Sequence, residues 1–251
     1  MNRQHYYDLM IAPAKLDYEL YLNTGQLLTC QKPFDKLVNA DELQFQIVHQ
    51  VEELWMKLIV ATLLDIDDHI QSGHVHKVMT LFARASLTLK MMTDQLDLLE
   101  TMSPRDYQQI RLQLGNGSGQ ESPGFRILMR MIPELWLSFE ERYLTARALS
   151  VRDIYDHKYE HDDAYVIAEG LIEFDERMAK FRAMHILLIQ RSIGMGAASL
   201  KGRPVELLDA GVKHRFFPQL WEVRHQMTDD WGGTYGKVRD SLSASLDAHS
   251  E

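Results

Sequence analysis

The hydrophobic and polar positions of this chain recur with the period of amphipathic helices. In the segment from about residue 41 to residue 70, apolar residues return every three or four positions, as on a helix that buries one face. These positions are Leu43, Ile47, Val51, Leu54, Trp55, Leu58 and Ile59. Segments from about 76 to 101 and from about 164 to 193 show the same period. Their predicted buried positions are Val78, Leu81, Phe82, Ala85, Leu89, Met92, Leu96 and Leu99, then Ile167, Leu171, Phe174, Met178, Phe181, Met184, Leu188 and Ile189.

Capping residues set the expected ends of these helices. Asn39 is a predicted cap for the first helix, with Glu42 three residues later to reach back to it, and Gly73 is its expected end. The stretch 103–106, Ser-Pro-Arg-Asp, combines a serine cap with a proline in the first turn and predicts a short third helix. We expect further helices over about 125–150 and, after Pro204, from about residue 217.

No segment has the alternating period of a strand, and the chain has no internal repeat or low-complexity linker. The sequence therefore predicts an all-α fold, a bundle of long antiparallel helices. We expect one domain over residues 1–251, with an N-terminal arm over about 1–32 and a polar tail over about 241–251. The arm carries four tyrosines and is expected to form a short helix or to lie on a neighbouring chain.

Composition narrows the classes of function. The net charge of −9 argues against a nucleic-acid-binding surface, which needs an excess of Lys and Arg. The one cysteine, Cys30, excludes an internal disulfide framework and suits a reducing cytoplasm. Neither adjoining residue, Thr29 or Gln31, is a basic group that would activate its thiol. The first residues lack the apolar core of a signal peptide, and the longest apolar run, residues 58–64, is too short to span a bilayer.

The glycine-rich stretch 114–124 is the only one of its kind in the chain. It matches neither the phosphate-binding loops, which follow a strand, nor the nucleophile elbow, because Ser118 lacks the flanking glycines of that motif. Two interpretations stay open: a plain turn, or a loop whose backbone approaches a ligand closely.

Two histidines lie beside the apolar faces of separate long helices, His49 on the first and His185 on the segment 164–193. A single histidine in such a place is usually a core residue with a hydrogen-bonded neighbour. Two of them also allow a planar cofactor between the helices, with one histidine as the axial ligand of an iron and the other on the open side.

Other polar groups allow two interpretations each. Arg111 lies one helical turn after Tyr107, so both point the same way; the guanidinium could grip a carboxylate or take part in a surface ion pair. His157 and His161 are four residues apart, as in helical metal pairs, but they sit in a run of Lys, Glu and Asp, which favours a solvated cluster.

Six stretches together resemble the tryptophan 2,3-dioxygenase family. The central one is Phe-Gln-Ile-Val-His-Gln-Val-Glu-Glu-Leu-Trp-Met-Lys at 45–57. The others follow in the family's order: 21–28, 103–107, 111–115 with the Ser-Gly at 118–119, 181–194 and 216–221. The resemblance runs from about residue 18 to residue 224.

The resemblance implies a heme b-binding, all-helical homotetramer that acts on tryptophan with O2. His185 would be the proximal iron ligand and His49 the distal histidine near the indole N–H. The remaining implied contacts are Phe45 on the indole ring, Arg111 on the substrate carboxylate with Tyr107 beside it, Ser118 near the distal histidine, and Tyr18 and Tyr21, which in the family reach the site partly from an adjacent subunit.

The chain departs from the family pattern after the proximal histidine. The family's glycine-rich segment there, whose threonine contacts the substrate ammonium, corresponds to 195–204, where Ser199 stands in for the threonine and most glycines are replaced. We therefore expect a dioxygenase that opens the indole ring of L-tryptophan or a close relative. The alternatives are a tailoring oxygenase that inserts one oxygen atom into a substituted tryptophan or another aromatic amino acid, and a heme-binding bundle without turnover.

Overall fold

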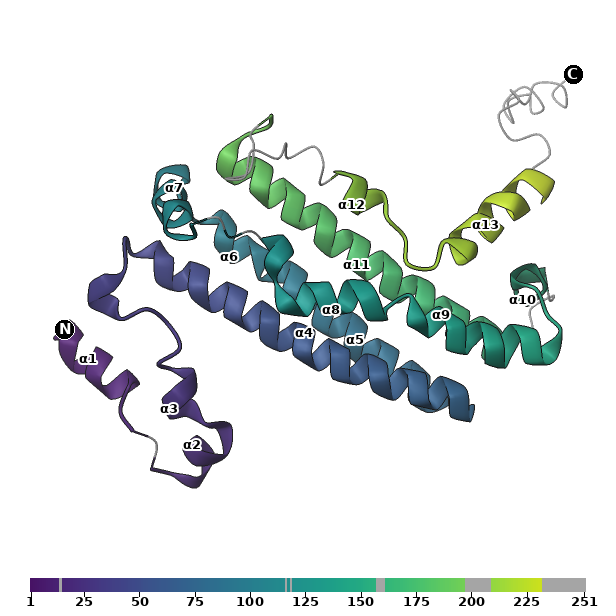
Figure 1. Ribbon diagram of the computed structural model, residues 1–251, viewed down its shortest axis with the longest axis horizontal. Helices are drawn as coiled ribbons and strands as arrows, with labels where there is room; N and C mark the ends of the chain where they lie inside the picture. Colours follow the sequence, from purple (N-terminus) through teal and green to yellow (C-terminus); the bar gives the residue numbers. More distant parts are fainter. Residues whose placement is uncertain (14, 116, 118, 157–160, 197–208, 232–251) are drawn as a thin grey trace, which may run out of the picture.

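The chain forms helices joined by turns, and the part that the structure describes contains no strand (Figure 1). The computed structural model describes residues 1–13, 15–115, 117, 119–156, 161–196 and 209–231. The α-helices are α1 (Arg3–Met10), α2 (Asp17–Leu22), α3 (Thr24–Leu27), α4 (Asp41–Ser72), α5 (Val75–Asp94), α6 (Leu96–Glu100), α7 (Pro104–Gln113), α8 (Pro123–Met131), α9 (Glu134–Phe139), α10 (Val151–Asp156), α11 (Asp163–Ile193), α12 (Asp209–Lys213) and α13 (Pro218–Trp231). Four shorter turns are η1 (Phe34–Lys36), η2 (Gly119–Glu121), η3 (Glu140–Leu144) and η4 (Thr145–Arg147). The all-α prediction is confirmed.

Helix α5 lies between the two longest helices, α4 and α11, and contacts both along its length (Figure 1). Gly73, at φ +73°, ends α4 as predicted and lets the chain turn back into α5, so these two helices are antiparallel. All eight predicted core positions of the segment 76–101 are buried. Gly170 makes the close approach of α11 to α5 possible, because a Cβ there would lie 2.7 Å from Phe82 Cδ2.

Two predicted helix starts are confirmed. Ser103 Oγ accepts from the Asp106 N–H at 3.1 Å, with Pro104 in the first turn of α7. Asn39 Oδ1 accepts from the Glu42 N–H at 3.1 Å, so Asn39 does cap α4. Glu42 itself reaches back to the N–H of Val38 and not to that of Asn39.

The predicted buried face of α4 is partly wrong. Ile47, Leu54 and Leu58 are 42%, 49% and 39% exposed. The buried face carries Val48, Glu52, Met56, Ile59, Leu63, Ile66 and Ile70 instead. The helix has apolar residues on two faces, and a period of three and four residues does not say which of them meets the core.

The helix predicted over 125–150 is also wrong as one element. It begins earlier, at Pro123, and is divided into α8, α9, η3 and η4, and residues 151–156 form the separate helix α10. Pro133 divides α8 from α9, because proline has no N–H for the helical hydrogen bond and crowds the preceding turn. Ala148, in the left-handed region at φ 52°, ends η4.

A buried carboxylate attaches the C-terminal helix to the bundle. Asp175 of α11 has no exposed surface, and its Oδ2 accepts from the N–H groups of Phe216 and Phe217 and from Trp221 Nε1 at 2.9, 3.2 and 3.0 Å. Helix α12 was not predicted, and α13 begins one residue after the expected position. The predicted tail over 241–251 lies outside the described residues.

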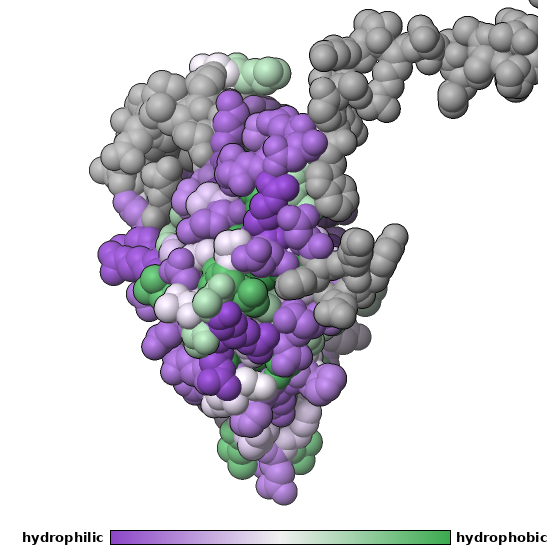
Figure 2. Space-filling model, turned by 90° about the vertical axis from the view of Figure 1, so that its right-hand side faces the viewer, coloured by the Kyte–Doolittle hydropathy of each residue, from purple (hydrophilic) through white to green (hydrophobic). Residues whose placement is uncertain are grey.

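The surface is mostly polar where the bundle ends beside α10 and α13 (Figure 2). No helix in the described ranges is both long enough and apolar enough to cross a bilayer. At the opposite end, α7, the first turns of α4 and the last turns of α11 come together (Figure 1). Most of the predicted site residues lie at that end.

Candidate functional site

His49 is a half-buried residue of α4 with a fixed tautomer. Its Nδ1 lies 2.7 Å from the carbonyl oxygen of Phe45, one turn earlier in the helix. A carbonyl oxygen can only accept, so Nδ1 carries the hydrogen and Nε2 keeps its lone pair. Burial lowers the pKa of the His49 imidazole, which keeps the ring neutral at pH 7. Nε2 is therefore available as a hydrogen-bond acceptor.

His185 lies near the end of α11, at the same end of the bundle as His49. Burial, and secondarily the nearby His49, lowers the pKa of His185 to about 4. In the described part of the chain, no hydrogen bond reaches its ring nitrogens, and its nearest ring neighbour is Phe181, with centroids 6.2 Å apart. His185 is thus a neutral imidazole whose lone pair meets no hydrogen-bond donor from the described residues.

The glycine-rich stretch meets His185 directly. A Cβ on Gly119 would lie 3.9 Å from His185 Cε1, so the backbone of the turn η2 runs close enough to the ring for one added side-chain atom to reach it. His49 also lowers the pKa of His185, so the two imidazoles lie within electrostatic range of each other although they come from distant parts of the chain. Of the two interpretations of this stretch, the structure favours close approach over a plain turn.

An aromatic and cationic wall adjoins His49. The Phe45 ring lies 4.1 Å from that of His49 and 6.3 Å from that of Tyr107, measured between centroids. Burial raises the pKa of the Tyr107 hydroxyl, and the charge of Arg111 opposes that shift. Tyr107 and Arg111 are both half-buried on α7, one turn apart, as the spacing predicted.

A cavity of about 380 Å³ opens between the first turns of α4 and the end of α7. Its lining residues are Lys32, Glu42, Phe45, Gln46, Ile110, Gln113 and Leu114. Lys32 Nζ and Glu42 Oε1 form an ion pair at 3.0 Å in its wall. The cavity thus reaches Phe45 from the side of the N-terminal arm.

The donor groups at this end fit a heme. An axial iron ligand has to be an unprotonated imidazole, and burial keeps His185 in that form at neutral pH. The backbone at Gly119 runs close to this ring, and the ring of Phe45 lies beside the second imidazole. Among the described residues, no group of three or more His, Cys, Asp or Glu side chains could hold a metal ion. The fit concerns the chemistry of these side chains, and the roles of the individual residues stay predictions.

Two predicted contacts are not brought to this site within the chain, and two others lie outside the described residues. Tyr18 and Tyr21 lie on α2 of the N-terminal arm, away from the bundle, and are 72% and 89% exposed (Figure 1). Ser118 and Ser199 lie outside the described residues. His157 also lies outside the described residues. His161 is exposed and its ring stacks on that of Tyr165, with ring centroids 4.1 Å apart.

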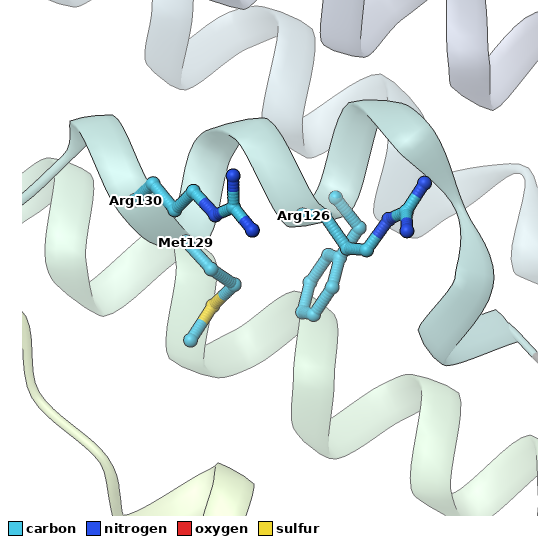
Figure 3. Close-up of a pocket in the computed structure, with 4 residues that line it drawn as sticks. Arg126, Met129 and Arg130 are labelled. Carbon is cyan, nitrogen blue, oxygen red and sulfur yellow. The ribbon is translucent and has the colours of Figure 1, made fainter.

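A second hollow, of about 270 Å³, lies on helix α8 and involves none of the predicted site residues. Phe125 and Met129 form its apolar part. The exposed Arg126 and Arg130 extend from the helix in the same direction, and Met129 points away from them (Figure 3). We do not assign it to the site.

The contacts that hold the glycine-rich stretch were not predicted from the sequence. Glu53, one turn after His49, accepts from Ser122 Oγ and from the Gly124 N–H, the latter at 3.0 Å. The available signal was the pair Ser122-Pro123, a serine followed by proline that marks a helix start like the one at residue 103. The partner of that cap lies on α4, which only the fold reveals.

The proteins to which this chain is similar are described as tryptophan 2,3-dioxygenases. The sequence profile of the tryptophan 2,3-dioxygenase family matches residues 8–146, more than half of the chain. A tryptophan 2,3-dioxygenase of Myxococcus xanthus (strain DK1622) is 28% identical over 264 residues, covering 86% of this chain and 91% of that protein. The tryptophan 2,3-dioxygenase of Erythrobacter litoralis (strain HTCC2594) is 28% identical, over 82% of this chain and 97% of that protein. That of Serratia proteamaculans (strain 568) is 26% identical, over 85% of this chain and 94% of that protein.

Proposed function

Because this chain belongs to the tryptophan 2,3-dioxygenase family, we propose that it is a heme-dependent dioxygenase that opens the indole ring of L-tryptophan. The reaction joins one tryptophan and one O2: the indole C2–C3 bond breaks, and each of the two carbons takes one oxygen atom, giving N-formylkynurenine. The observation that carries the proposal is the meeting of two neutral imidazoles, His49 and His185, at one end of the bundle.

His185 would hold the iron of heme b through its uncommitted ring nitrogen. The bound heme supplies the ferrous iron at which O2 becomes reactive. The burial that lowers the pKa of His185 to about 4 prevents a proton from competing with the metal for this nitrogen at neutral pH.

His49 would accept a hydrogen bond from the indole N–H at its free Nε2. Its Nδ1–H, already donated to the Phe45 carbonyl, fixes the ring orientation that this contact needs. As a neutral acceptor, His49 orients the indole, and the reaction does not require it as a strong base. Phe45, with its ring beside His49, would pack on the indole face.

Arg111 would pair with the carboxylate of the amino acid, with the Tyr107 hydroxyl beside it. The effect of Arg111 on the Tyr107 pKa supports this arrangement, because it shows a positive charge next to the phenol. We assign the substrate ammonium to Ser199 and a place near the distal histidine to Ser118 by their positions in the family pattern.

The proposal extends to assembly. The N-terminal arm exposes many large apolar side chains, among them Leu16, Tyr18, Leu20 and Tyr21, and α4 exposes Ile47, Leu54 and Leu58. Faces of this kind are usually covered in an oligomer. We propose a homotetramer in the cytoplasm, in which residues 1–251 form one domain and the arm reaches the site of a neighbouring subunit. Mass photometry of the purified protein measures the subunit number.

Isotope labelling tests the reaction. The ferrous protein is mixed with tryptophan and labelled O2, and the product is analysed by mass spectrometry. We expect N-formylkynurenine with two labelled oxygen atoms. One labelled atom in an unopened ring would instead establish a monooxygenase. His185→Ala should lose the heme Soret band, and a variant that keeps all of its heme would contradict the ligand assignment.

A further inference from the structure

A carboxylate on α4 fixes the N-terminus of α8. Glu53 Oε2 accepts from the N–H of Gly124 at 3.0 Å, and Glu53 Oε1 accepts from the hydroxyl of Ser122. The same hydroxyl accepts from the N–H of Phe125 at 3.0 Å, so Ser122 is the N-cap of α8 and links it to Glu53. A negative charge is favourable at this end of a helix, where unpaired N–H groups concentrate.

Gly124 allows this contact to form. A Cβ at position 124 would lie 2.8 Å from Glu53 Oε2 and 2.8 Å from Met56 Cβ. Both distances are shorter than the van der Waals contact that a methyl group needs, so an alanine at position 124 would force α8 away from α4. The first turn of α8 therefore lies directly against α4, at the turn that follows His49.

The fixed helix end also fixes the turn before it. The Ser122 N–H donates to the carbonyl of Gly119 at 3.1 Å, closing the turn η2. Gly119 is the residue at which an added Cβ would be in van der Waals contact with His185. A continuous series of contacts thus runs from Glu53 through Ser122 and Gly119 to the ring of His185.

We infer that Glu53 is a positioning residue, which holds the turn 119–122 against His185 by binding Ser122 and Gly124 at the start of α8. Glu53 is proposed to act through Ser122 and Gly124. The inference rests on the proposed function in one respect, namely that His185 faces the heme. The contacts themselves do not depend on it. Glu53 also lies close enough to His49 for its charge to favour the protonated ring, against the larger effect of burial.

The test compares four variants in the heme-free protein and with hemin. Glu53→Ala removes both hydrogen bonds, and Glu53→Gln keeps an acceptor for one of them. Gly124→Ala pushes α8 away while the carboxylate remains. Asp65→Asn is the control, because Asp65 is an exposed carboxylate of the same helix.

Hydrogen exchange of the heme-free proteins gives the first measurement. Amides of residues 119–125 should exchange about tenfold faster in Glu53→Ala and in Gly124→Ala, and by a smaller factor in Glu53→Gln, while those of the core helix α5 stay protected. Faster exchange throughout the chain would indicate a general loss of stability and would overturn the inference. Unchanged exchange over 119–125 would do the same.

Hemin titration and kinetics give the second measurement, which separates positioning from stability. Glu53→Ala should unfold thermally like the wild type, but it should bind hemin about fivefold more weakly and have a shifted Soret band. Glu53→Gln should recover part of the hemin affinity and part of the Soret position. Asp65→Asn should change neither. If wild-type protein binds no hemin and forms no product, the proposed function fails while the exchange data still decide the role of Glu53. If wild-type protein is active and Glu53→Ala binds hemin normally, only the role of Glu53 fails.

Discussion

Replacing the buried Glu52 by glutamine should stabilise the protein, and more so at higher pH. Glu52 lies on the core face of α4, 9% exposed, and its Oε1 has no hydrogen-bond partner among the residues described. Burial raises the pKa of this carboxyl group from 4.5 to about 7. The Gln95 amide opposes the shift, although its Nε2 makes no hydrogen bond of normal geometry.

The direction with pH follows from the two protonation states. Below pH 4.5 the carboxyl group is protonated in both the folded and the unfolded chain, and its ionisation costs nothing. As the pH rises toward 7, the unfolded chain releases this proton while the folded chain keeps it, so the free energy of unfolding falls. The difference between 4.5 and about 7, at 1.36 kcal/mol per pKa unit, corresponds to about 3 kcal/mol above pH 7.

Urea denaturation of the heme-free protein at pH 5 and pH 8 measures this effect. Glu52→Gln is neutral at both pH values, so its advantage over the wild type should grow by about 2 kcal/mol between them. Asp65→Asn, which removes an exposed carboxylate from the same helix, should show no such growth. An advantage of the glutamine variant that is equal at both pH values would refute the reasoning, and so would a glutamine variant that is less stable at pH 8.

Three further substitutions test the packing and the site. Gly170→Ala gains about 1 kcal/mol of helix propensity but places a Cβ 2.7 Å from Phe82 Cδ2, so the free energy of unfolding should fall by up to about 2 kcal/mol. Urea denaturation measures this fall. In the control Gly211→Ala, where the added Cβ has no atom within 4 Å, the free energy of unfolding should not fall. Arg111→Leu should weaken tryptophan binding by about 2 kcal/mol and tryptamine binding much less, and equal losses measured by titration calorimetry would argue against a carboxylate contact. His49→Ala should keep heme but lower kcat/KM for tryptophan about fivefold, the value of one hydrogen bond, and lower it less for N1-methyltryptophan, which has no N–H to donate. Equal kinetics for wild type and variant would exclude a distal role.

The long helices were predictable from the sequence because their evidence is local. The period of apolar residues located α5 and α11, and the caps at Asn39 and Ser103 and the glycine at position 73 located helix ends within a few residues. Each of these signals acts within one or two turns of the chain. The pairing of Tyr107 with Arg111 on one face of α7 was predictable for the same reason.

Other features depended on contacts between distant segments. The period of α4 did not decide between its two apolar faces, and packing against α5, α8 and α9 buried Val48 and Met56 while leaving Leu54 exposed. The pKa of Glu52 is a property of that packing and not of the sequence around it.

The sequence determined that each of two histidines lies beside an apolar face of its own long helix, because helical period fixes the direction of a side chain relative to that helix. Only the tertiary structure decided that α4 and α11 bring these two imidazoles to one end of the bundle, and that Glu53 holds the glycine-rich turn against one of them. The physical reason is that direction on a helix is set by neighbours in the chain, whereas distance between helices is set by side chains that fill the space between them, such as Phe82 against Gly170.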